Sequence, residues 1–251
     1  MFEVKDLSIY YGSKQIVENI NFEVKPRDWF MVLGPNGVGK SSIVNAISGS
    51  LPYEGVIEFR GQDINQMRPK IKAQNIGILT QHHSVAYHYS VEEVISLGRY
   101  AYRQSMFSSL TLEDEEKIEE AIQVTGLSRY RYDSILSLSG GEQQRVYLAQ
   151  VIAQNPNVLI LDEPANHLDL AYQEQIFQTI HDWLQEGDRC VISIIHDLSV
   201  AKYYGNRGIL LYDSQTVSQG EIDNVLESQY LEQAYKIDVK SIMNERYSLW
   251  T

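Results

Sequence analysis

Cysteine is almost absent from this 251-residue sequence, which contains Cys190 alone. An internal disulfide framework and a cysteine-rich metal site are therefore excluded. Cys190 opens an apolar run that ends at Ile195, which favours a buried thiol over a reactive one. Long apolar stretches are also absent, because none approaches the roughly 18 residues that a membrane-crossing helix needs. Residues 1–6 show no basic region followed by an apolar one, so we expect no secretory signal and a cytoplasmic location.

Basic side chains are few, with 21 Lys and Arg against 33 Asp and Glu and a formal net charge of −12. Unspecific nucleic-acid binding depends on Lys and Arg contacts with phosphates, so this balance disfavours a nucleic-acid partner. It does not forbid a bound nucleotide, since a local loop can hold phosphate within an acidic chain. The sequence is 43% hydrophobic, enough for one large α/β domain or for a core with a small inserted subdomain.

Four short apolar segments are typical of strands buried on both faces of a sheet. Each ends in polar residues at its carboxyl end, where the ligand site of an open α/β sheet forms. The segments are residues 29–33, 75–79, 158–161 and 190–195. We therefore expect the polar residues that follow the strands to gather at one place. These residues are Lys40, Gln81, Asp162, Glu163 and His196.

Other segments predict an antiparallel layer, a helical insertion and a helical tail. Residues 2–11, 20–24 and 55–61 alternate in polarity or turn at glycine, as antiparallel strands do. Helical spacing appears at residues 91–98 and 113–127. We therefore predict a catalytic core of residues 1–81 and 138–220, a helical insertion of residues 82–137, and a tail of residues 221–251.

The segment 34–41 fits the phosphate-binding pattern G-x-x-x-x-G-K-[ST]. Its glycines let the backbone wrap tightly, so that successive N–H groups and the N-terminus of the next helix point at one anion. A strand before the loop and a helix after it provide the required context, which argues against an ordinary glycine-rich turn. The predicted phosphate-binding residues are Gly34, Pro35, Asn36, Gly37, Val38, Gly39, Lys40, Ser41 and Ser42.

The side chains at this edge predict ATP and Mg²⁺ as ligands. Lys40 is expected to reach the β- and γ-phosphates, and the Ser41 hydroxyl to ligate Mg²⁺. Asp162 ends an apolar strand and is expected to hold the same ion through water. Glu163 follows it and can polarise an attacking water. An acidic strand end is a weak signal alone, but together with the phosphate loop it predicts ATP hydrolysis.

A second helix start, at Ser139, has the residues of a capping box, with Glu142 three positions later. Gly140 and Gly141 lie just inside this helix, which we expect to continue to Ala153. Glycines there leave backbone N–H groups uncovered, and the helix dipole favours an anion beside them. The sequence therefore predicts a second phosphate site. One glycine loop and one separate phosphate-seeking helix end suggest that two chains share each nucleotide.

The segment 138–145, Leu-Ser-Gly-Gly-Glu-Gln-Gln-Arg, resembles the signature of the ATP-binding-cassette (ABC) family, and the resemblance extends over residues 2–220. It implies a P-loop NTPase with a RecA-like core of mixed sheet, an antiparallel β layer and an inserted α-helical subdomain. By resemblance, Tyr11 stacks on adenine, with Tyr10 as the alternative. Gln81 contacts Mg²⁺ and the partner domain, residues 166–169 with Asp169 cross between protomers, and His196 contacts the γ-phosphate. One departure is Ala165, where the family often has Thr.

The resemblance also implies an assembly. Two copies of the chain close head to tail over two ATPs, with Lys40, Ser41, Asp162, Gln81 and His196 of one copy facing Ser139 to Gly141 of the other. Glu163 acts as general base or water-positioner. ATP hydrolysis is coupled to a transmembrane permease, so the chain is expected at the inner face of the cell membrane, with an extracytoplasmic substrate-binding protein as an indirect partner.

Two segments and the tail resemble importers of the iron-siderophore, haem and vitamin B12 type. The segments are residues 98–100 and 169–173, and the alternative is that they are generic surface variations. The permease is expected to dock near residues 81–102, where His82, His83, Tyr87 and Tyr89 are candidate contacts. A metal site formed by His82, His83 and His88 is disfavoured, because this loop has no acidic or cysteine companions.

Three other functions compete with chelate import. The first is import of another small solute or metal complex. The second is a soluble ABC ATPase acting on ribosomes or DNA, which usually has two cassettes, a basic arm or a long coiled coil, and none of these is found here. The third is a non-catalytic binding module, which is disfavoured because every expected site residue is present.

Overall fold

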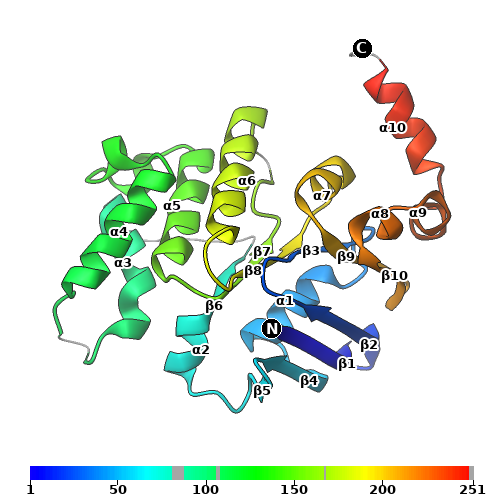
Figure 1. Ribbon diagram of the computed structural model, residues 1–251, viewed down its shortest axis with the longest axis horizontal. Coiled ribbons are helices and arrows are strands. Elements are labelled where there is room, and N and C mark those ends of the chain that lie inside the picture. Colours follow the sequence, from blue (N-terminus) through cyan, green and yellow to red (C-terminus); the bar gives the residue numbers. More distant parts are fainter. Residues whose placement is uncertain (81–87, 106–107, 167, 249–251) are drawn as a thin grey trace. The chain divides into compact units, whose positions relative to one another are not determined.

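The computed structural model describes residues 1–80, 88–105, 108–166 and 168–248 (Figure 1). The chain divides into two compact units. The first combines Met1–Gln66 with Ile192–Thr251, and the second is Met67–Val191. The chain returns from the second unit to the first inside a single strand, β8 (Cys190–Ile194). Among the described residues, no helix has the length and apolar character needed to span a membrane.

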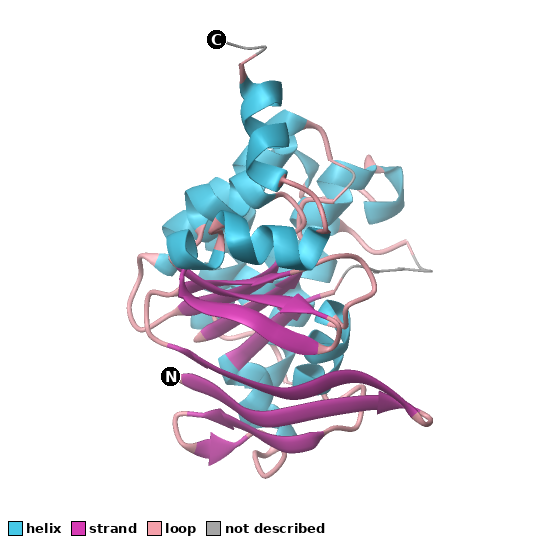
Figure 2. Ribbon diagram, turned by 90° about the vertical axis from the view of Figure 1, so that its right-hand side faces the viewer, coloured by secondary structure: helices cyan, strands magenta, loops and turns pink. Residues whose placement is uncertain are grey.

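An antiparallel sheet of order β2-β1-β4-β5 forms one layer of the first unit (Figure 2). Its long strand β1 alternates buried apolar side chains, from Phe2 to Ile9, with more exposed ones, which is the two-residue period of a half-buried strand. The predicted antiparallel layer is therefore confirmed. The strands are β1 (Phe2–Tyr11), β2 (Lys14–Val24), β4 (Glu54–Phe59) and β5 (Gln62–Asp63).

The second sheet of the first unit carries the phosphate loop. Strand β3 (Trp29–Leu33) is buried at every residue and pairs in parallel with β9 (Arg207–Tyr212), which forms an antiparallel hairpin with β10 (Gln215–Glu221). On its other side β3 neighbours β8, and the indole N–H of Trp29 donates to the Ser193 hydroxyl at 2.9 Å. Phe22 of β2 stacks on Phe30 of β3 with ring centroids 4.9 Å apart, which joins the two layers.

Helices of the first unit follow the strand ends or form the tail. Helix α1 (Lys40–Ser48) follows the phosphate loop, and α7 (Leu198–Tyr204) follows β8. The predicted helical tail is present as α8 (Ile222–Val225), α9 (Ser228–Tyr235) and α10 (Val239–Tyr247). The tail buries a row of apolar side chains, which fixes α8 and α9 against the β9–β10 hairpin. These side chains are Ile222, Val225, Leu226, Leu231 and Ala234.

The second unit is mainly helical around one pair of parallel strands. Strand β6 (Ile76–Leu79) pairs with β7 (Val158–Asp162), as the two apolar runs predict. Gly77 lets α5 approach β6, because a Cβ there would lie 2.6 Å from Val151. The α-helices are α2 (Pro69–Asn75), α3 (Val91–Ser96), α4 (Leu112–Val124), α5 (Gly140–Ala153) and α6 (Leu170–Leu184). Short 3₁₀ helices are η1 (Leu97–Tyr102), η2 (Ser128–Tyr130) and η3 (Ile135–Ser137).

Capping residues start several of these helices. Thr111 caps α4 and forms a capping box with Asp114, and Ser90 forms another with Glu93 at α3. The proposed boundaries of the insertion, residues 82–137, remain a prediction. Within that range the described chain contains α3, η1, α4, η2 and η3.

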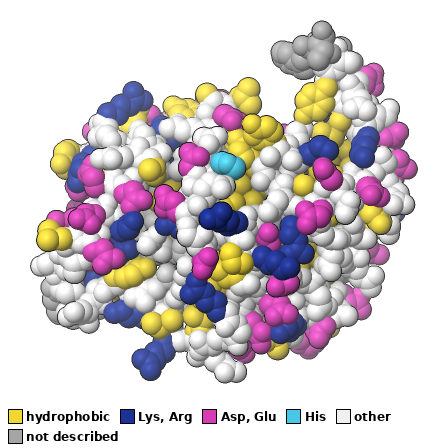
Figure 3. All heavy atoms as spheres, in the orientation of Figure 1, with side chains coloured by type: hydrophobic (Ala, Val, Ile, Leu, Met, Phe, Trp, Pro, Cys, Tyr) yellow, Lys and Arg dark blue, Asp and Glu magenta, His cyan; other side chains and the backbone are white. Residues whose placement is uncertain are grey.

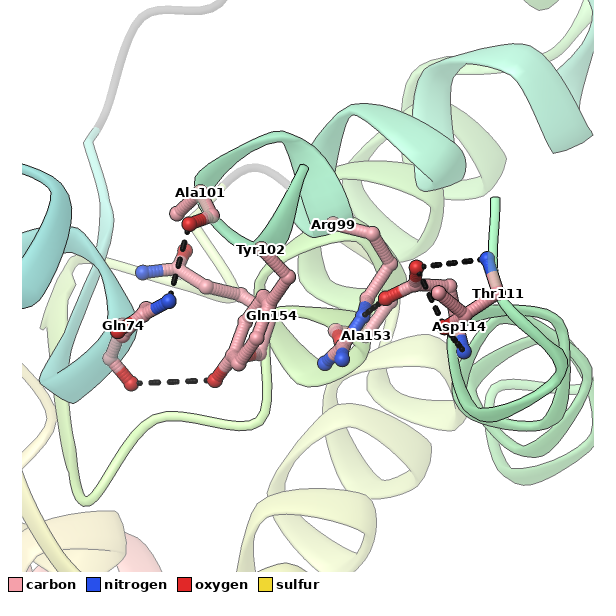
Figure 4. A network of polar contacts seen from close by, with 8 residues as sticks. All are labelled: Gln74, Arg99, Ala101, Tyr102, Thr111, Asp114, Ala153 and Gln154. Carbon is pink, nitrogen blue, oxygen red and sulfur yellow. Dashed lines mark hydrogen bonds and ion pairs between the residues drawn. The ribbon is translucent and has the colours of Figure 1, made fainter. Parts of the chain in front are cut away.

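Arg99 joins η1 to α4 and α5 at the centre of the helical insertion (Figure 4). Its side chain is 1% exposed, and its Nε donates to the Asp114 carboxylate at 2.7 Å while an Nη donates to the Ala153 carbonyl at 3.0 Å. The guanidinium also lies 3.7 Å from the ring centroid of Tyr102. Within the segment 98–100, Gly98 and Arg99 are therefore internal residues, whereas Tyr100 is 56% exposed.

Gly98 allows that tie to form. A Cβ at this position would lie 2.1 Å from the backbone oxygen of Gln150 in α5, so a side chain does not fit without moving the helix. Burial raises the pKa of the Asp114 carboxyl, but hydrogen bonds from Thr111 and Arg99 outweigh it and hold the pKa below its ordinary value. The contribution of Asp114 to stability is therefore present above pH of about 3.9 and is lost as the pH falls through the lower folded value.

We predict that Arg99→Ala lowers the free energy of unfolding by about 3–5 kcal/mol, because it leaves the Asp114 charge buried without its partner. Chemical denaturation followed by circular dichroism measures this change. Arg129→Ala in the same unit is the control, since the Arg129 side chain is 72% exposed and 3.9 Å from its acidic partner. The control should change stability by about 0–1 kcal/mol. Equal effects of the two substitutions would contradict the role of Arg99.

Candidate functional site

The residues that the sequence predicts for the site are divided between the two units. The first unit contains Tyr11, residues 34–42 and His196. The second contains Ser139, Gly140, Gly141, Glu142, Asp162, Glu163 and Asp169. Gln81 lies outside the described residues, as do His82, His83 and Tyr87 of the predicted docking loop and His167 of the segment 166–169.

The phosphate loop connects β3 to α1 and adopts backbone angles that only glycine tolerates easily. Gly34, Gly37 and Gly39 have φ of 143°, 78° and 106°. A Cβ on Gly34 would lie 2.4 Å from the Leu211 oxygen of β9, and one on Gly39 would lie 2.7 Å from Val17. The neighbouring strands therefore lie too close to the loop for a side chain at either position, so glycine is required at Gly34 and at Gly39.

Helix α1 begins with N–H groups that no capping side chain covers. Its N-cap is Gly39, which makes no side-chain hydrogen bond, and its first turn contains no acidic residue. The positive end of the helix dipole therefore faces the loop without an internal anion. In contrast, α3, α4, α5, α6 and α7 all have a Ser, Thr or Asp side chain that caps their first turn. Helices α2, α8 and α9 also lack a side-chain cap, so it is the preceding glycine loop together with Lys40 that favours α1 as the anion-binding helix of the first unit.

Lys40 lies under the loop. Its side chain is buried, and Nζ donates to the carbonyls of Gly34 at 2.7 Å and Pro35 at 2.9 Å. A single ammonium thus holds the first two carbonyls of the loop and places a positive charge beside the α1 N-terminus. Ser41 and Ser42 follow Lys40 in the first turn of α1. Their hydroxyl groups therefore belong to the same helix end as the backbone N–H groups that no side chain caps.

Two tyrosines and one histidine of the first unit lie at the surface. Tyr11 is 51% exposed at the end of β1, and Tyr10 is 39% exposed beside it, where its hydroxyl accepts from Gln15 at 3.3 Å. Both rings are open to stacking, so the predicted choice of Tyr11 over Tyr10 remains open. His196 is exposed just after β8, and the next residue, Asp197, caps α7.

Asp162 and Glu163 occupy the carboxyl end of β7 in the second unit. Asp162 is 5% exposed and is the last residue of the strand. Glu163 has φ of 55°, a left-handed conformation that is unfavourable for a residue with a side chain and is typical of active-site residues. Asn166 holds the Glu163 carboxylate at 2.6 Å, which sequence reasoning did not predict. Ala165 is buried in the same turn, so this departure from the family pattern falls at a packing position.

The capping box at the start of α5 is confirmed. The Ser139 N–H and hydroxyl donate to the Glu142 carboxylate at 2.9 and 2.8 Å, and the Ser139 hydroxyl accepts the Glu142 N–H at 3.4 Å. Tyr130 donates a further hydrogen bond to this carboxylate. Hydrogen bonds from Tyr130 and Ser139 lower the pKa of Glu142 to about 2. Tyr130 was not predicted, because a tyrosine 12 positions before Glu142 carries no sequence signal.

The two glycines of α5 differ in their surroundings. A Cβ on Gly140 would meet nothing within 4 Å, whereas one on Gly141 would lie 3.2 Å from the Tyr172 ring. Tyr172 belongs to α6, whose N-cap is Asp169 with a carboxylate that accepts the Tyr172 N–H at 3.0 Å. Asp169 thus builds the start of α6 beside α5. The open surface at Gly140 leaves the first N–H groups of α5 accessible to an anion.

Among the described residues, no group of three or more His, Cys, Asp and Glu side chains is placed to hold a metal ion. His88, the member of the predicted histidine trio that is described, lies 3.5 Å from the Ser134 hydroxyl. Whether the trio assembles therefore stays untested, because its other two members lie outside the described residues.

Known proteins are similar in sequence to this chain over almost its whole length. The family model described as ABC transporter matches residues 17–166. The ATP-binding protein YvrA of Bacillus subtilis is 32% identical over 97% of this chain, which spans about half (55%) of that protein. The iron(3+)-hydroxamate import ATP-binding protein FhuC of Bacillus subtilis is 33% identical over 96% of this chain and 90% of its own length. The hemin import ATP-binding protein HmuV of Pseudomonas aeruginosa is 35% identical over 95% of this chain and 94% of its own.

Solved structures agree with this assignment. An inward-facing ABC transporter assigned to the metal-chelate type has 27% identity and a TM-score of 0.82, over 94% of this chain and 89% of its own. The ATP-binding cassette MJ0796, solved as a dimer with ADP and phosphate, has 26% identity and a TM-score of 0.77, over 88% of this chain and 99% of its own. A mixed sheet with helices and a separate antiparallel layer is therefore the predicted P-loop fold. The chain belongs to the ABC transporter family, among its ATP-binding proteins.

Proposed function

We propose that this ATP-binding subunit powers the import of a metal chelate of the iron-siderophore, haem or cobalamin type through a partner permease. The observation that carries the proposal is 33–35% identity, over nearly the whole chain, to subunits named for iron-hydroxamate and hemin import. The similarity to a metal-chelate transporter structure supports the same class. In this proposal, ATP hydrolysis by this subunit drives a conformational change of the permease.

The residues of the phosphate loop are suited to hold the triphosphate. The uncapped start of α1 and the Lys40 ammonium favour a multiply charged anion. Ser41 and Asp162 provide the hydroxyl and carboxylate oxygens that Mg²⁺ prefers, and we propose both as its ligands together with Gln81. Mg²⁺, when bound, neutralises charge on the phosphates. Glu163, fixed by Asn166, is our candidate for orienting and deprotonating the attacking water.

We further propose that two copies of the chain share each nucleotide. The start of α5 at Gly140 is open to solvent on the isolated chain, and its first N–H groups suit a phosphate of a second copy's nucleotide. The MJ0796 cassette forms a dimer in its ADP- and phosphate-bound state. In this arrangement Ser139, Gly140 and Gly141 of one copy face the phosphate loop of the other, and His196 approaches the γ-phosphate.

The permease provides the membrane part of the transporter. We therefore propose that this chain lies at the cytoplasmic face of the membrane and contacts the permease through residues near 81–102, with Tyr89 of this range 44% exposed. A substrate-binding protein outside the membrane delivers the chelate. An importer of another small solute would have the same ATP site. The proposed chelate class therefore depends on similarity to the known import proteins and not on the residues of the site.

A soluble ATPase that acts on nucleic acid is disfavoured by charge. The chain has a formal net charge of −12, and on the face shown in Figure 3 acidic and basic side chains are interspersed. A protein that neutralises several phosphates gathers Lys and Arg on one surface. A salt-sensitive gel shift with DNA or RNA would reverse this preference.

We predict that Glu163→Gln lowers the kcat of ATP hydrolysis by at least about 100-fold, because the amide cannot accept the proton of the attacking water. The Kd for ATP should change little, because the phosphate loop is unaltered. Phosphate release and binding of a fluorescent ATP analogue measure the two quantities. Glu116→Gln on the exposed face of α4 is the control and should retain wild-type hydrolysis. Activity of Glu163→Gln near wild type would refute the assignment of Glu163.

The transport proposal predicts a chelate-dependent ATPase. The chain is reconstituted in proteoliposomes with a candidate permease and binding protein, and ATP hydrolysis is measured with ferric hydroxamate, hemin or cobalamin. One of the three should stimulate hydrolysis through its loaded binding protein, because substrate delivery favours the closed, hydrolysing state. The control is the same vesicle with metal-free ligand. Association with the permease but no stimulation by any chelate would move the chain to another importer class.

A further inference from the structure

A side chain of α5 is bonded to the turn that carries Glu163. The amide Nε2 of Gln144 donates to the Pro164 carbonyl at 3.0 Å, across 20 positions of the chain. Pro164 directly follows Glu163 and is buried, and a buried carbonyl needs a donor. The three residues belong to the second unit. Helix α5 and the end of β7 are therefore joined by a hydrogen bond beside the carboxylate that we propose to act on water.

The turn from Glu163 to Asn166 is closed by its own hydrogen bonds. The Asn166 N–H donates to the Glu163 carbonyl at 3.2 Å, and the Asn166 amide donates to the Glu163 carboxylate at 2.6 Å. Between these residues the ring of Pro164 fixes its φ, so ψ is the backbone rotation that Pro164 retains. That rotation sets the direction of the carbonyl that Gln144 holds. Gln144 therefore restricts the turn that keeps Glu163 at its unfavourable φ of 55° and determines where the carboxylate points.

The backbone of Gln144 lies near the start of α5. Gln144 follows Gly140 by four residues, so the two positions lie one turn apart on the same side of the helix. A Cβ on Gly140 would meet nothing within 4 Å, and this open helix start is the second phosphate site that we propose. The hydrogen-bonded helix moves as a rigid element. A displacement of the α5 start therefore carries Gln144 with it.

A second contact joins the same parts of the chain at Gly141. A Cβ there would lie 3.2 Å from the Tyr172 ring and 3.4 Å from the Leu168 side chain, so both side chains lie close to the glycine. Leu168 belongs to the segment between Glu163 and α6, and Tyr172 to the first turn of α6. The chain that leaves Glu163 is therefore in contact with α5 at Pro164 and again at the start of α6.

Arg145, the neighbour of Gln144, holds Tyr172 in place. Its guanidinium lies 4.9 Å from the ring centroid of Tyr172. The Arg145 side chain is buried, and its Nη1 donates to the Thr125 carbonyl at 3.2 Å and to the Gln175 side-chain oxygen at 3.3 Å. Two consecutive residues of α5 thus bond to the turn after β7 and to α6.

We propose that Gln144 is a positioning residue that places Glu163 according to the position of α5. When the nucleotide of a second copy occupies the start of α5, the hydrogen bond from Gln144 holds the Pro164 peptide, and the Glu163 carboxylate keeps the direction that its water requires. The occupancy of one nucleotide site is thereby coupled, within one chain, to the carboxylate that acts at the other site. This inference rests on the proposed sharing of nucleotides between two copies and on the proposed role of Glu163.

The test is Gln144→Met in the full chain. Methionine has a similar length but no N–H, so the substitution removes the donor to Pro164 and retains the bulk of the side chain. We expect the kcat of ATP hydrolysis, measured as phosphate release, to fall by about three- to tenfold, the effect of one lost hydrogen bond. The Kd for a fluorescent ATP analogue should stay within a factor of about two, because the phosphate loop is unaltered.

Gln123→Met is the matched control. Gln123 is exposed on α4 in the same unit, and its amide donates to Glu119 of the same helix at 2.7 Å. The control removes the same atoms but no bond to the turn of Glu163, so its kcat and Kd should equal those of the wild type. A folded Gln144→Met protein with wild-type kcat would overturn the inference. A wild-type chain that hydrolyses no ATP would instead refute the proposed function, so the two failures are distinguishable.

A double-mutant cycle with Glu163→Gln tests whether Gln144 acts through Glu163. In the Glu163→Gln background, Gln144→Met should lower kcat by less than about twofold, because the carboxylate that Gln144 positions is absent. A structural effect unrelated to Glu163 would give losses that multiply, and that outcome would overturn the proposal. If Gln144→Met does not fold, Gln144→Glu takes its place in both experiments, since its side chain has the shape of glutamine but its carboxylate does not donate.

Discussion

A helix N-terminus without a capping side chain is the feature on which the rest of the first unit depends. The start of α1 leaves several N–H groups directed at the phosphate loop, and Gly39 in place of Ser or Asp keeps an internal acceptor away. The backbone of Leu211 in β9 lies so close to the loop that a side chain would not fit at residue 34, which is why glycine is required there. Lys40 adds a positive charge while bound to two loop carbonyls. This helix end therefore lacks the stabilising hydrogen bond of a side-chain cap, and in the proposed ATP site the phosphates would accept from its N–H groups instead.

In the second unit the charged groups, unlike the start of α1, already have hydrogen-bond partners. Its carboxylates are held by neighbours before any ligand arrives: Glu163 by Asn166, Asp114 by Arg99, and Glu142 by Ser139 and Tyr130. These bonds fix charged side chains in one geometry, which for Glu163 suits the role that we propose for it and for Asp114 stabilises the contact between η1 and α4. The unfavourable φ of Glu163 belongs to the same pattern, since the surrounding turn determines a conformation that the residue alone would avoid.

Local patterns predicted much of this structure from the sequence. The apolar runs at 29–33 and 158–161 are the buried strands β3 and β7, and the box that begins at Ser139 starts α5. Contacts between distant residues could not be predicted. In the sequence, Arg99 contributed only to a resemblance to a family, although in the structure it is buried and bonded to two other helices. That role could not be predicted, because its partners Asp114 and Ala153 are distant in the sequence. Gln81 stays a prediction, as it lies outside the described residues.

The hydrogen bonds to Glu142 have a consequence for acidity inside a cell. A carboxyl group with a pKa of about 2 keeps its charge throughout the range of pH that cytoplasm experiences, even under acid stress. Its contribution to folding is complete above the unfolded pKa of about 4.3 and disappears only as the pH falls towards 2. The Glu142 carboxylate at the start of α5 is therefore permanently charged. If the enzyme's rate responds to mild acidification, the group whose titration changes that rate must therefore lie elsewhere than at Glu142.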